Sequence, residues 1–164
     1  MSDISEFKVL FVCTGNTCRS PIAEGITRKL ASERKADHIK VCSAGTIASD
    51  GLPATEYAIE AARHWDVDIS NHRSKPLDRE LIGEADLILA MEGEHIKRIT
   101  SIDGSASSRS YLLKAFPEPF KTGQEQVDDP IGGTLDQYNQ TFLELDEVIR
   151  KIFPHIIKMS QSKG

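Results

Sequence analysis

A short apolar run that leads directly into a glycine-containing loop most constrains how this chain can fold. Residues 7–12 are nearly continuously apolar, which is typical of a strand buried on both faces of a parallel sheet. The next eight residues, CTGNTCRS at positions 13–20, stand directly before Pro21. Ser20 followed by Pro21 is a good helix cap followed by a good first helical residue. The segment therefore predicts a strand, a tight loop and the start of a helix.

The predicted loop is suited to binding an anion. Gly15 and Asn16 suit the positive φ angles of a tight loop. Backbone N–H groups along such a loop converge on an anion and favour negative charge at Cys13, which predicts an ionised thiol at neutral pH. Arg19, six positions later, can bind two phosphate oxygens at once. The phosphate is expected to lie among Thr14, Gly15, Asn16, Thr17, Cys18 and Arg19.

A structural alternative exists for this cysteine. A cysteine that ends a strand is usually a small buried apolar residue, and a cysteine and an arginine six positions apart also occur by chance. The strand before the loop, the Gly-Asn pair inside it and the Ser-Pro pair after it favour a nucleophile, because the surroundings of a motif decide its meaning.

Asp129 is the candidate proton donor for a leaving group. It precedes Pro130, which holds its backbone in an extended conformation. Gly132 and Gly133 permit the turn that follows. Asp-Pro is also an ordinary turn initiator, so the interpretation of Asp129 as a catalytic acid depends on the presence of Cys13 as nucleophile.

The rest of the chain alternates between strand and helix patterns. Strands are expected at 7–12, 39–43, 87–90 and 110–113, and helices at 21–34, 54–65, 78–85, 92–99 and along Leu135, Tyr138, Phe142, Leu145, Val148 and Ile152. This order predicts an α/β fold with a central parallel sheet of about four strands and helices on both faces. Ligands then bind at the carboxyl ends of the strands, where Cys13 lies.

Single residues predict finer features of the fold. Pro154 should end or kink the last helix, and residues 158–164 should be frayed. Asp78 is expected to cap a short helix, and residues 103–106 to form a soft linker. Trp65 and the apolar stripe of the last helix are interpreted as core. Solvent exposure is expected for His38, His64, His95 and His155.

Composition narrows the class of protein. A length of 164 residues with 39% hydrophobic content suits one globular domain, residues 1–164. No apolar stretch could span a bilayer and residues 1–6 do not resemble a secretory signal, so a cytoplasmic protein without membrane partners is expected. A net charge of −5 disfavours nucleic-acid binding. The three cysteines lack metal-ligand spacing.

Four segments resemble the low-molecular-weight protein tyrosine phosphatases, over nearly the whole chain. They are VLFVCTGNTCRSPIAEG from residue 9, SAGT from residue 43, ISNHR from residue 69, and Asp129-Pro130. The resemblance implies that Cys13 is the nucleophile, that Arg19 binds phosphate and that Asp129 is the general acid. It also implies a hydrogen-bonded set that stiffens the loop and stabilises the thiolate, formed by Asn16, Ser20, Ser43 and His72.

Two positions bear on the substrate within that family. Thr17 replaces the isoleucine common in tyrosine-directed members, and threonine is the mark of the protein-arginine phosphatases. Tyrosine-directed members often stack aromatic residues that follow Asp-Pro against the substrate ring, whereas Ile131 offers no ring. Ile131 also departs from the aromatic residue of the arginine-directed members. The resemblance favours phosphoarginine, with phosphotyrosine as the alternative, unless Thr17 only satisfies a local hydrogen bond.

The implied reaction is a two-step hydrolysis through a cysteinyl-phosphate, without metal or organic cofactor. Its partners would be phosphorylated proteins, with inorganic phosphate as product and inhibitor, and a monomer is expected. Cys18 is either a passive loop residue or the partner of Cys13 in a reversible disulfide. An arsenate reductase would need more resolving cysteines than Cys18 and Cys42, and a non-catalytic phosphoprotein-binding module has no use for both Cys13 and Asp129.

Overall fold

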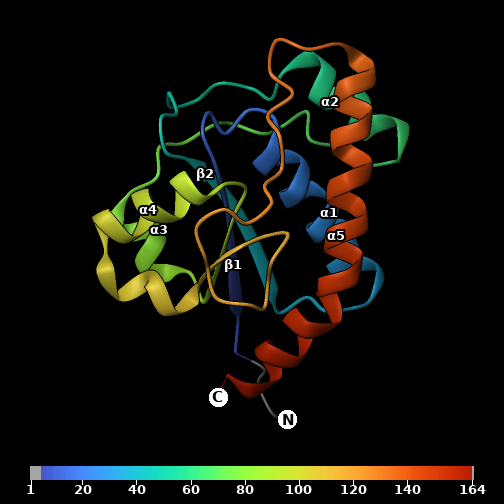
Figure 1. The fold of residues 1–164 in the computed structure, drawn as a ribbon. Coiled ribbons are helices and arrows are strands. Elements are labelled where there is room, and N and C mark those ends of the chain that lie inside the picture. Colours follow the sequence, from blue (N-terminus) through green and yellow to red (C-terminus); the bar gives the residue numbers. More distant parts are fainter. Residues whose placement is uncertain (1–4, 164) are drawn as a thin grey trace.

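A four-stranded parallel sheet forms the centre of the computed structural model, which describes residues 5–163 (Figure 1). In sheet order the strands are β2 (Ile39–Gly45), β1 (Phe7–Cys13), β3 (Leu87–Ala90) and β4 (Ser110–Leu112). All three strand pairs are parallel. Cys13, the last residue of β1, is in register with Gly45, the last residue of β2. The predicted α/β fold is confirmed.

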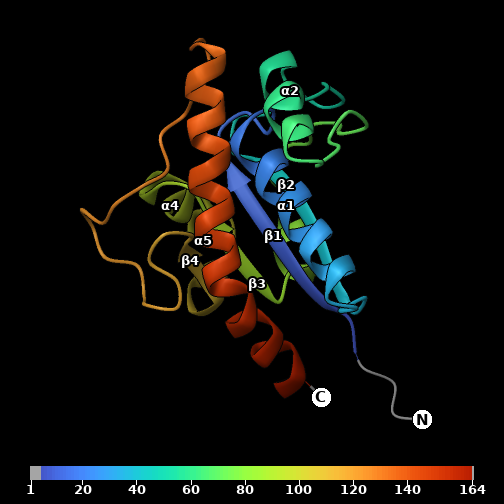
Figure 2. The ribbon, with the colours of Figure 1, turned by 90° about the vertical axis from the view of Figure 1, so that its right-hand side faces the viewer.

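Helices cover both faces of the sheet. One face packs against α1 (Arg19–Glu33), α2 (Glu56–His64) and α5 (Leu135–Ser162), and the other against α3 (Arg79–Glu84), α4 (Gly93–Ile102) and the 3-10 helix η1 (Gly104–Arg109). Figures 1 and 2 show α1 beside α5, with α3 and α4 across the sheet. Within β1, Val9 and Phe11 are buried on the first face and Leu10 and Val12 on the second. Because both faces of the sheet are covered, polar functional side chains are expected at the ends of the strands.

Helix α5 continues past Pro154 to Ser162. Its axis bends in the red, C-terminal part (Figures 1 and 2). Of the two outcomes predicted for Pro154, the kink is observed and the helix end is not. The prediction of fraying is wrong as far as Ser162, because Ser160 is buried and its hydroxyl lies 2.8 Å from His38 Nε2. Tertiary contacts here outweigh the local signals.

The start of α1 also differs from the prediction. The helix begins at Arg19, so Ser20 lies in its first turn rather than at the cap. The Ser20 hydroxyl instead contacts Cys13 Sγ, at 2.9 Å. Asn16 has a positive φ of 57°, as predicted, whereas Gly15 does not adopt a positive φ.

Three smaller predictions have mixed outcomes. Asp78 caps α3 through the Leu81 N–H, as expected. Residues 103–106 are not a linker, because Asp103 accepts from the Ser105 N–H and caps η1. The stripe of α5 is largely core, but Trp65 is 46% exposed and stacks on Phe142 at the edge of the core.

Candidate active site

The loop between β1 and α1 places Cys13 at the carboxyl end of the sheet. Sγ of Cys13 lies 2.9 Å from Ser20 Oγ and accepts the Asn16 N–H at 3.3 Å. Gly45 permits the loop to lie against β2, because a Cβ there would stand 2.5 Å from the Thr14 carbonyl oxygen. The loop is therefore held by its own hydrogen bonds and by a close approach of the neighbouring strand.

Asn16 is the centre of the network that stiffens the loop. Its Nδ2 donates to Ser20 Oγ at 2.8 Å and to Ser43 Oγ at 2.9 Å. His72 Nε2 lies 2.7 Å from the Asn16 carbonyl oxygen. The four residues of the expected support set are thus brought together from the loop, α1, the end of β2 and the segment after α2. Beyond them, Ser43 donates to Glu24 at 2.6 Å, a contact that the sequence did not indicate.

Burial is the largest influence on the Cys13 thiol, which is 2% exposed. It raises the pKa of Cys13 above its ordinary value, because an ion loses its hydration there. The Ser20 hydroxyl, the Ser20 and Asn16 amides and the Arg19 charge all lower the pKa of Cys13, but they only partly offset burial. The direction of this shift is opposite to the one that the sequence predicted, because burial outweighs the amides, the Ser20 hydroxyl and Arg19.

Replacing Ser20 with alanine should raise the pKa of Cys13 further, because the hydroxyl that stabilises the thiolate is lost. At any fixed pH a smaller fraction of Cys13 is then ionised, so the rising limb of kcat/KM against pH should move to higher pH. Alkylation of the thiol by iodoacetate across pH would report the same shift. Ser108→Ala, on η1, is the control. Superimposable profiles for Ser20→Ala and the wild type would contradict this role.

Arg19 is buried, with 1% of its surface exposed, and is held by contacts from three segments. Nη1 donates to Glu92 Oε2 at 2.5 Å and to the Val127 carbonyl oxygen at 2.9 Å. Nη2 donates to Thr14 Oγ1 at 3.3 Å. Among the described residues, Nε is buried without a partner. A buried N–H of this kind is costly unless it binds something, which suits a donor reserved for an anion.

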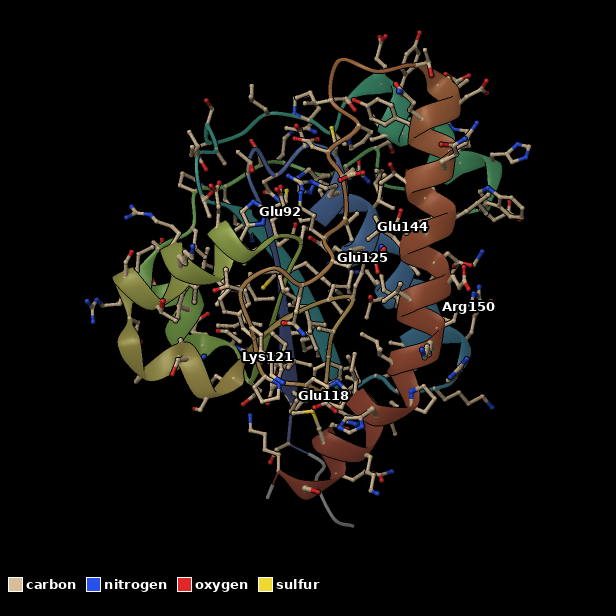
Figure 3. All side chains as sticks on the ribbon, in the orientation of Figure 1. Glu92, Glu118, Lys121, Glu125, Glu144 and Arg150 are labelled. Atoms are coloured by element: carbon tan, nitrogen blue, oxygen red, sulfur yellow. The ribbon has the colours of Figure 1, made fainter. Side chains whose placement is uncertain are left out.

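Glu92 was not identified from the sequence. It lies just after β3 and directly before α4 (Figure 3), and the parallel register of β1 and β3 places it at the same end of the sheet as Cys13. Its carboxylate faces the buried Arg19 guanidinium and compensates that charge. The available signal was its position, because residues that follow the ends of neighbouring parallel strands lie close together.

Asp129 lies over the loop from the segment that precedes α5. Its Oδ2 is 3.5 Å from Arg19 Nη2, and its Oδ1 accepts the Ile131 N–H at 3.1 Å. A third of its side chain is exposed, so it can reach a ligand from the solvent side. One small cavity is lined by seven of the residues singled out from the sequence: Cys13, Gly15, Thr17, Cys18, Arg19, Asp129 and Ile131.

His95 was expected to be solvated, and that prediction is wrong. Its side chain is 3% exposed, with Nε2 2.9 Å from Thr14 Oγ1. Burial and the nearby Arg19 charge lower the pKa of His95 to about 4. No periodic pattern marks this residue, because α4 comes beside the loop only through the order of the strands.

Cys18 is buried, with 4% of its surface exposed. Its Sγ lies 3.4 Å from the Tyr138 hydroxyl and 3.6 Å from Thr55 Oγ1. Burial and the Cys18 contact raise the pKa of Tyr138 to about 12. Tyr138 therefore meets the thiol as a neutral phenol.

No group of three or more histidine, cysteine or acidic side chains within residues 5–163 is placed to hold a metal ion. In the same part of the chain, no helix is both long and apolar enough to cross a bilayer.

Comparison with known families decides the class of this site. A sequence model described as low molecular weight phosphotyrosine protein phosphatase matches residues 8–162. The chain belongs to this family. This low-molecular-weight phosphatase is therefore a hydrolase of the cysteine-dependent protein phosphatase class. Membership of this family favours a phosphatase over an arsenate reductase and over a non-catalytic phosphoprotein-binding module.

Two relatives differ in their named substrate. The phosphatase is 41% identical over 151 residues to the protein-arginine-phosphatase of Bacillus subtilis (strain 168), covering 92% of this chain and 97% of the relative. It is 33% identical over 146 residues to the low molecular weight protein-tyrosine-phosphatase Etp of Escherichia coli (strain K12), covering 85% and 95%.

A solved structure supports the fold match. It is a cysteine-to-serine mutant of YwlE arginine phosphatase with a phosphorylated active-site serine. It superposes with a TM-score of 0.84 at 39% identity, covering 93% of this chain and 97% of that chain.

Proposed function

We propose that this phosphatase hydrolyses phosphoarginine in proteins, with Cys13, Arg19 and Asp129 as the reacting residues. The observation that carries the proposal is their convergence on one cavity. Thr17 and Ile131 line the same cavity and are the candidate determinants of specificity.

In the first step the Cys13 sulfur, as thiolate, attacks phosphorus in line with the leaving nitrogen. The phosphorus–nitrogen bond breaks, and protonated Asp129 gives its proton to the departing guanidino group. Arginine leaves and a cysteinyl-phosphate remains. Arg19 and the loop amides hold the phosphoryl oxygens as charge spreads over them.

In the second step Asp129, now a carboxylate, takes a proton from water as the water attacks phosphorus. The sulfur–phosphorus bond breaks and inorganic phosphate is released. We expect phosphate to inhibit the enzyme, because it binds the same loop. Arg19 and the amides supply the positive charge, so the mechanism requires no metal or organic cofactor.

The choice of phosphoarginine rests on two observations. The B. subtilis relative, 41% identical over nearly the whole chain, is named a protein-arginine-phosphatase. At the mouth of the cavity, Ile131 is 59% exposed and provides no aromatic surface for a phenol ring. Phosphotyrosine is the second candidate, because Etp is named a protein-tyrosine-phosphatase.

Replacing Thr17 with isoleucine should favour phosphotyrosine over phosphoarginine peptides. The substitution removes a hydroxyl and adds apolar surface to the cavity wall, so we expect the ratio of the two kcat/KM values to change by about tenfold. Paired peptides that differ only in the phosphorylated residue would measure it. Thr100→Ile, on α4, is the matched control. An unchanged ratio would remove the assignment to phosphoarginine.

We further propose that Cys18 protects the nucleophile. Hydrogen peroxide would oxidise the Cys13 thiolate to a sulfenic acid, and the Cys18 thiol would then form a disulfide with it and release water. Cys18 must first leave its contacts with Tyr138 and Thr55.

Replacing Cys18 with alanine should make peroxide inactivation largely irreversible. Without the second thiol, the sulfenic acid at Cys13 oxidises further to forms that thiols do not reduce. Activity would be measured after peroxide and then after dithiothreitol, with Cys42→Ala as control. Full recovery of Cys18→Ala would show that Cys18 is a passive loop residue.

We propose that the enzyme is a cytoplasmic monomer and that residues 1–164 form one domain. Its partners would be phosphorylated proteins, without nucleic acid or membrane, in keeping with a net charge of −5. Sedimentation at working concentrations would test the monomer.

A further inference from the structure

His95 Nδ1 accepts the Glu92 backbone N–H at 3.1 Å, in the capping box that begins α4. That nitrogen therefore has no proton. A neutral imidazole has one N–H, which must be on Nε2. His95 Nε2 thus donates to Thr14 Oγ1 at 2.9 Å.

The Thr14 hydroxyl links this histidine to the phosphate-binding arginine. Its oxygen accepts from His95 Nε2 and also from Arg19 Nη2, at 3.3 Å. A hydroxyl oxygen has two lone pairs, and both are now engaged. The hydrogen bond from His95, on α4, therefore restricts rotation of the Thr14 side chain and fixes the position of Oγ1.

Both Nη atoms of Arg19 have hydrogen-bond partners, whereas Nε has none within residues 5–163. Nη1 is held by Glu92 and Val127, and Nη2 by Thr14, with Asp129 at 3.5 Å. Nε remains buried and without a partner among the described residues. Because the guanidinium is planar, fixing both Nη atoms also fixes the direction of the Nε–H bond.

We propose that His95 is a positioning residue for Arg19: through Thr14 it fixes the guanidinium so that Nε and its neighbouring donors meet the phosphoryl oxygens. It does not touch the substrate. This inference deepens the proposed function and rests on it for the identity of the anion. The charged groups that face His95 are Arg19, Glu92 and Asp129, and the neutral ring adds no charge to this set.

Two substitutions of His95 separate its two hydrogen bonds. Asparagine can place its Oδ1 where Nδ1 lies and so accept the Glu92 N–H, but it is too short to reach Thr14. Glutamine is longer and can place an amide N–H against Thr14 Oγ1. Thr14→Val removes the same link from its other end and keeps the side-chain shape. His38→Asn is the matched control, because His38 also bonds a hydroxyl through Nε2, that of Ser160, at the opposite end of the sheet.

The readouts are the dissociation constant of inorganic phosphate, by calorimetry, and kcat and KM for para-nitrophenyl phosphate. We expect His95→Asn and Thr14→Val each to weaken phosphate binding by about tenfold, as for loss of a hydrogen bond that orients a charged donor. The double variant should be no weaker than either single one. His95→Gln and His38→Asn should bind phosphate as the wild type does.

Phosphate affinity unchanged in Thr14→Val, additive losses in the double variant, or no recovery in His95→Gln would each overturn the proposal. If His95→Asn fails to fold, which a melting curve would show, unchanged phosphate affinity in Thr14→Val would still overturn the proposal. Phosphate binding requires no substrate, so the two failures are distinguishable. A wild type that binds phosphate but cleaves neither phosphoarginine nor phosphotyrosine peptides would contradict the proposed function and leave the His95 comparison intact.

Discussion

Replacing Cys13 with serine should lower turnover by about 10⁴-fold or more, because the nucleophile is lost while the anion cradle remains. A serine hydroxyl is a far weaker nucleophile than a thiolate at neutral pH. The loop amides and Arg19 do not depend on the sulfur, so inorganic phosphate should still bind. Steady-state hydrolysis of para-nitrophenyl phosphate and calorimetric titration with phosphate would measure the two quantities separately.

The matched control is Cys42→Ser, which makes the same chemical change on β2, three positions before Gly45. Its thiol is half-buried and takes no part in the proposed reaction. We expect turnover to be retained in that variant. A Cys13→Ser enzyme that works near the wild-type rate would remove Cys13 as nucleophile.

Asp129→Asn should lower kcat/KM for phosphoarginine peptides by about 10²- to 10⁴-fold, because asparagine cannot donate the proton that the leaving nitrogen needs. The effect should be smaller for para-nitrophenyl phosphate, whose leaving group departs without protonation. This dependence on the leaving group distinguishes general acid catalysis from a general disturbance of the loop. Comparison of kcat/KM for the two substrates in wild type and variant would measure it, because kcat/KM reports the first step and not the hydrolysis of the cysteinyl-phosphate.

Asp128→Asn controls for the loss of negative charge near the loop. Asp128 precedes Asp129 and lines a neighbouring groove with residues of α5, but it does not line the cavity that contains Cys13. It should retain most activity on both substrates. Equal losses in the two aspartate variants, or an Asp129→Asn loss that ignores the leaving group, would contradict the assignment.

The sequence was most informative where one local segment contains both structure and chemistry. The apolar run of β1 and the Gly-Asn loop determine local geometry, and Cys13 and Arg19 lie at the two ends of that loop. Their roles could therefore be inferred from spacing. Ser20 shows the limit of local rules: it has the composition of a cap, but its hydroxyl is used by Cys13 and Asn16 instead.

Residues contributed by distant segments were harder to find. Glu92 and His95 reach the loop because β3 pairs with β1, a choice that the sequence of α4 does not encode. Position after a strand end was a usable signal for Glu92. His95 lies in the first turn of α4, where the sequence pattern does not distinguish it from a surface histidine. Ser43 and His72 were identified only through the family resemblance.

Burial explains the remaining errors. The pKa of Cys13 follows from the loss of hydration on a fully enclosed strand end, and the loop amides oppose this effect without reversing it. Helix α5 continues past Pro154 because Phe153 and Ile156 are buried in the core. In both cases the deciding free energy comes from packing, which a local motif does not reveal.

In the proposed reaction Cys13 Sγ carries the phosphoryl group between the two steps. In Asp129→Asn, para-nitrophenyl phosphate should still transfer its phosphoryl group, while attack by water is slowed because the general base is lost. Rapid denaturing quench followed by mass spectrometry of the peptide that contains Cys13 tests the claim directly. We expect one phosphoryl group on Cys13 that accumulates and then decays at the rate of turnover. Continued release of phosphate with an unmodified Cys13, or a phosphoryl group on another residue, would contradict it.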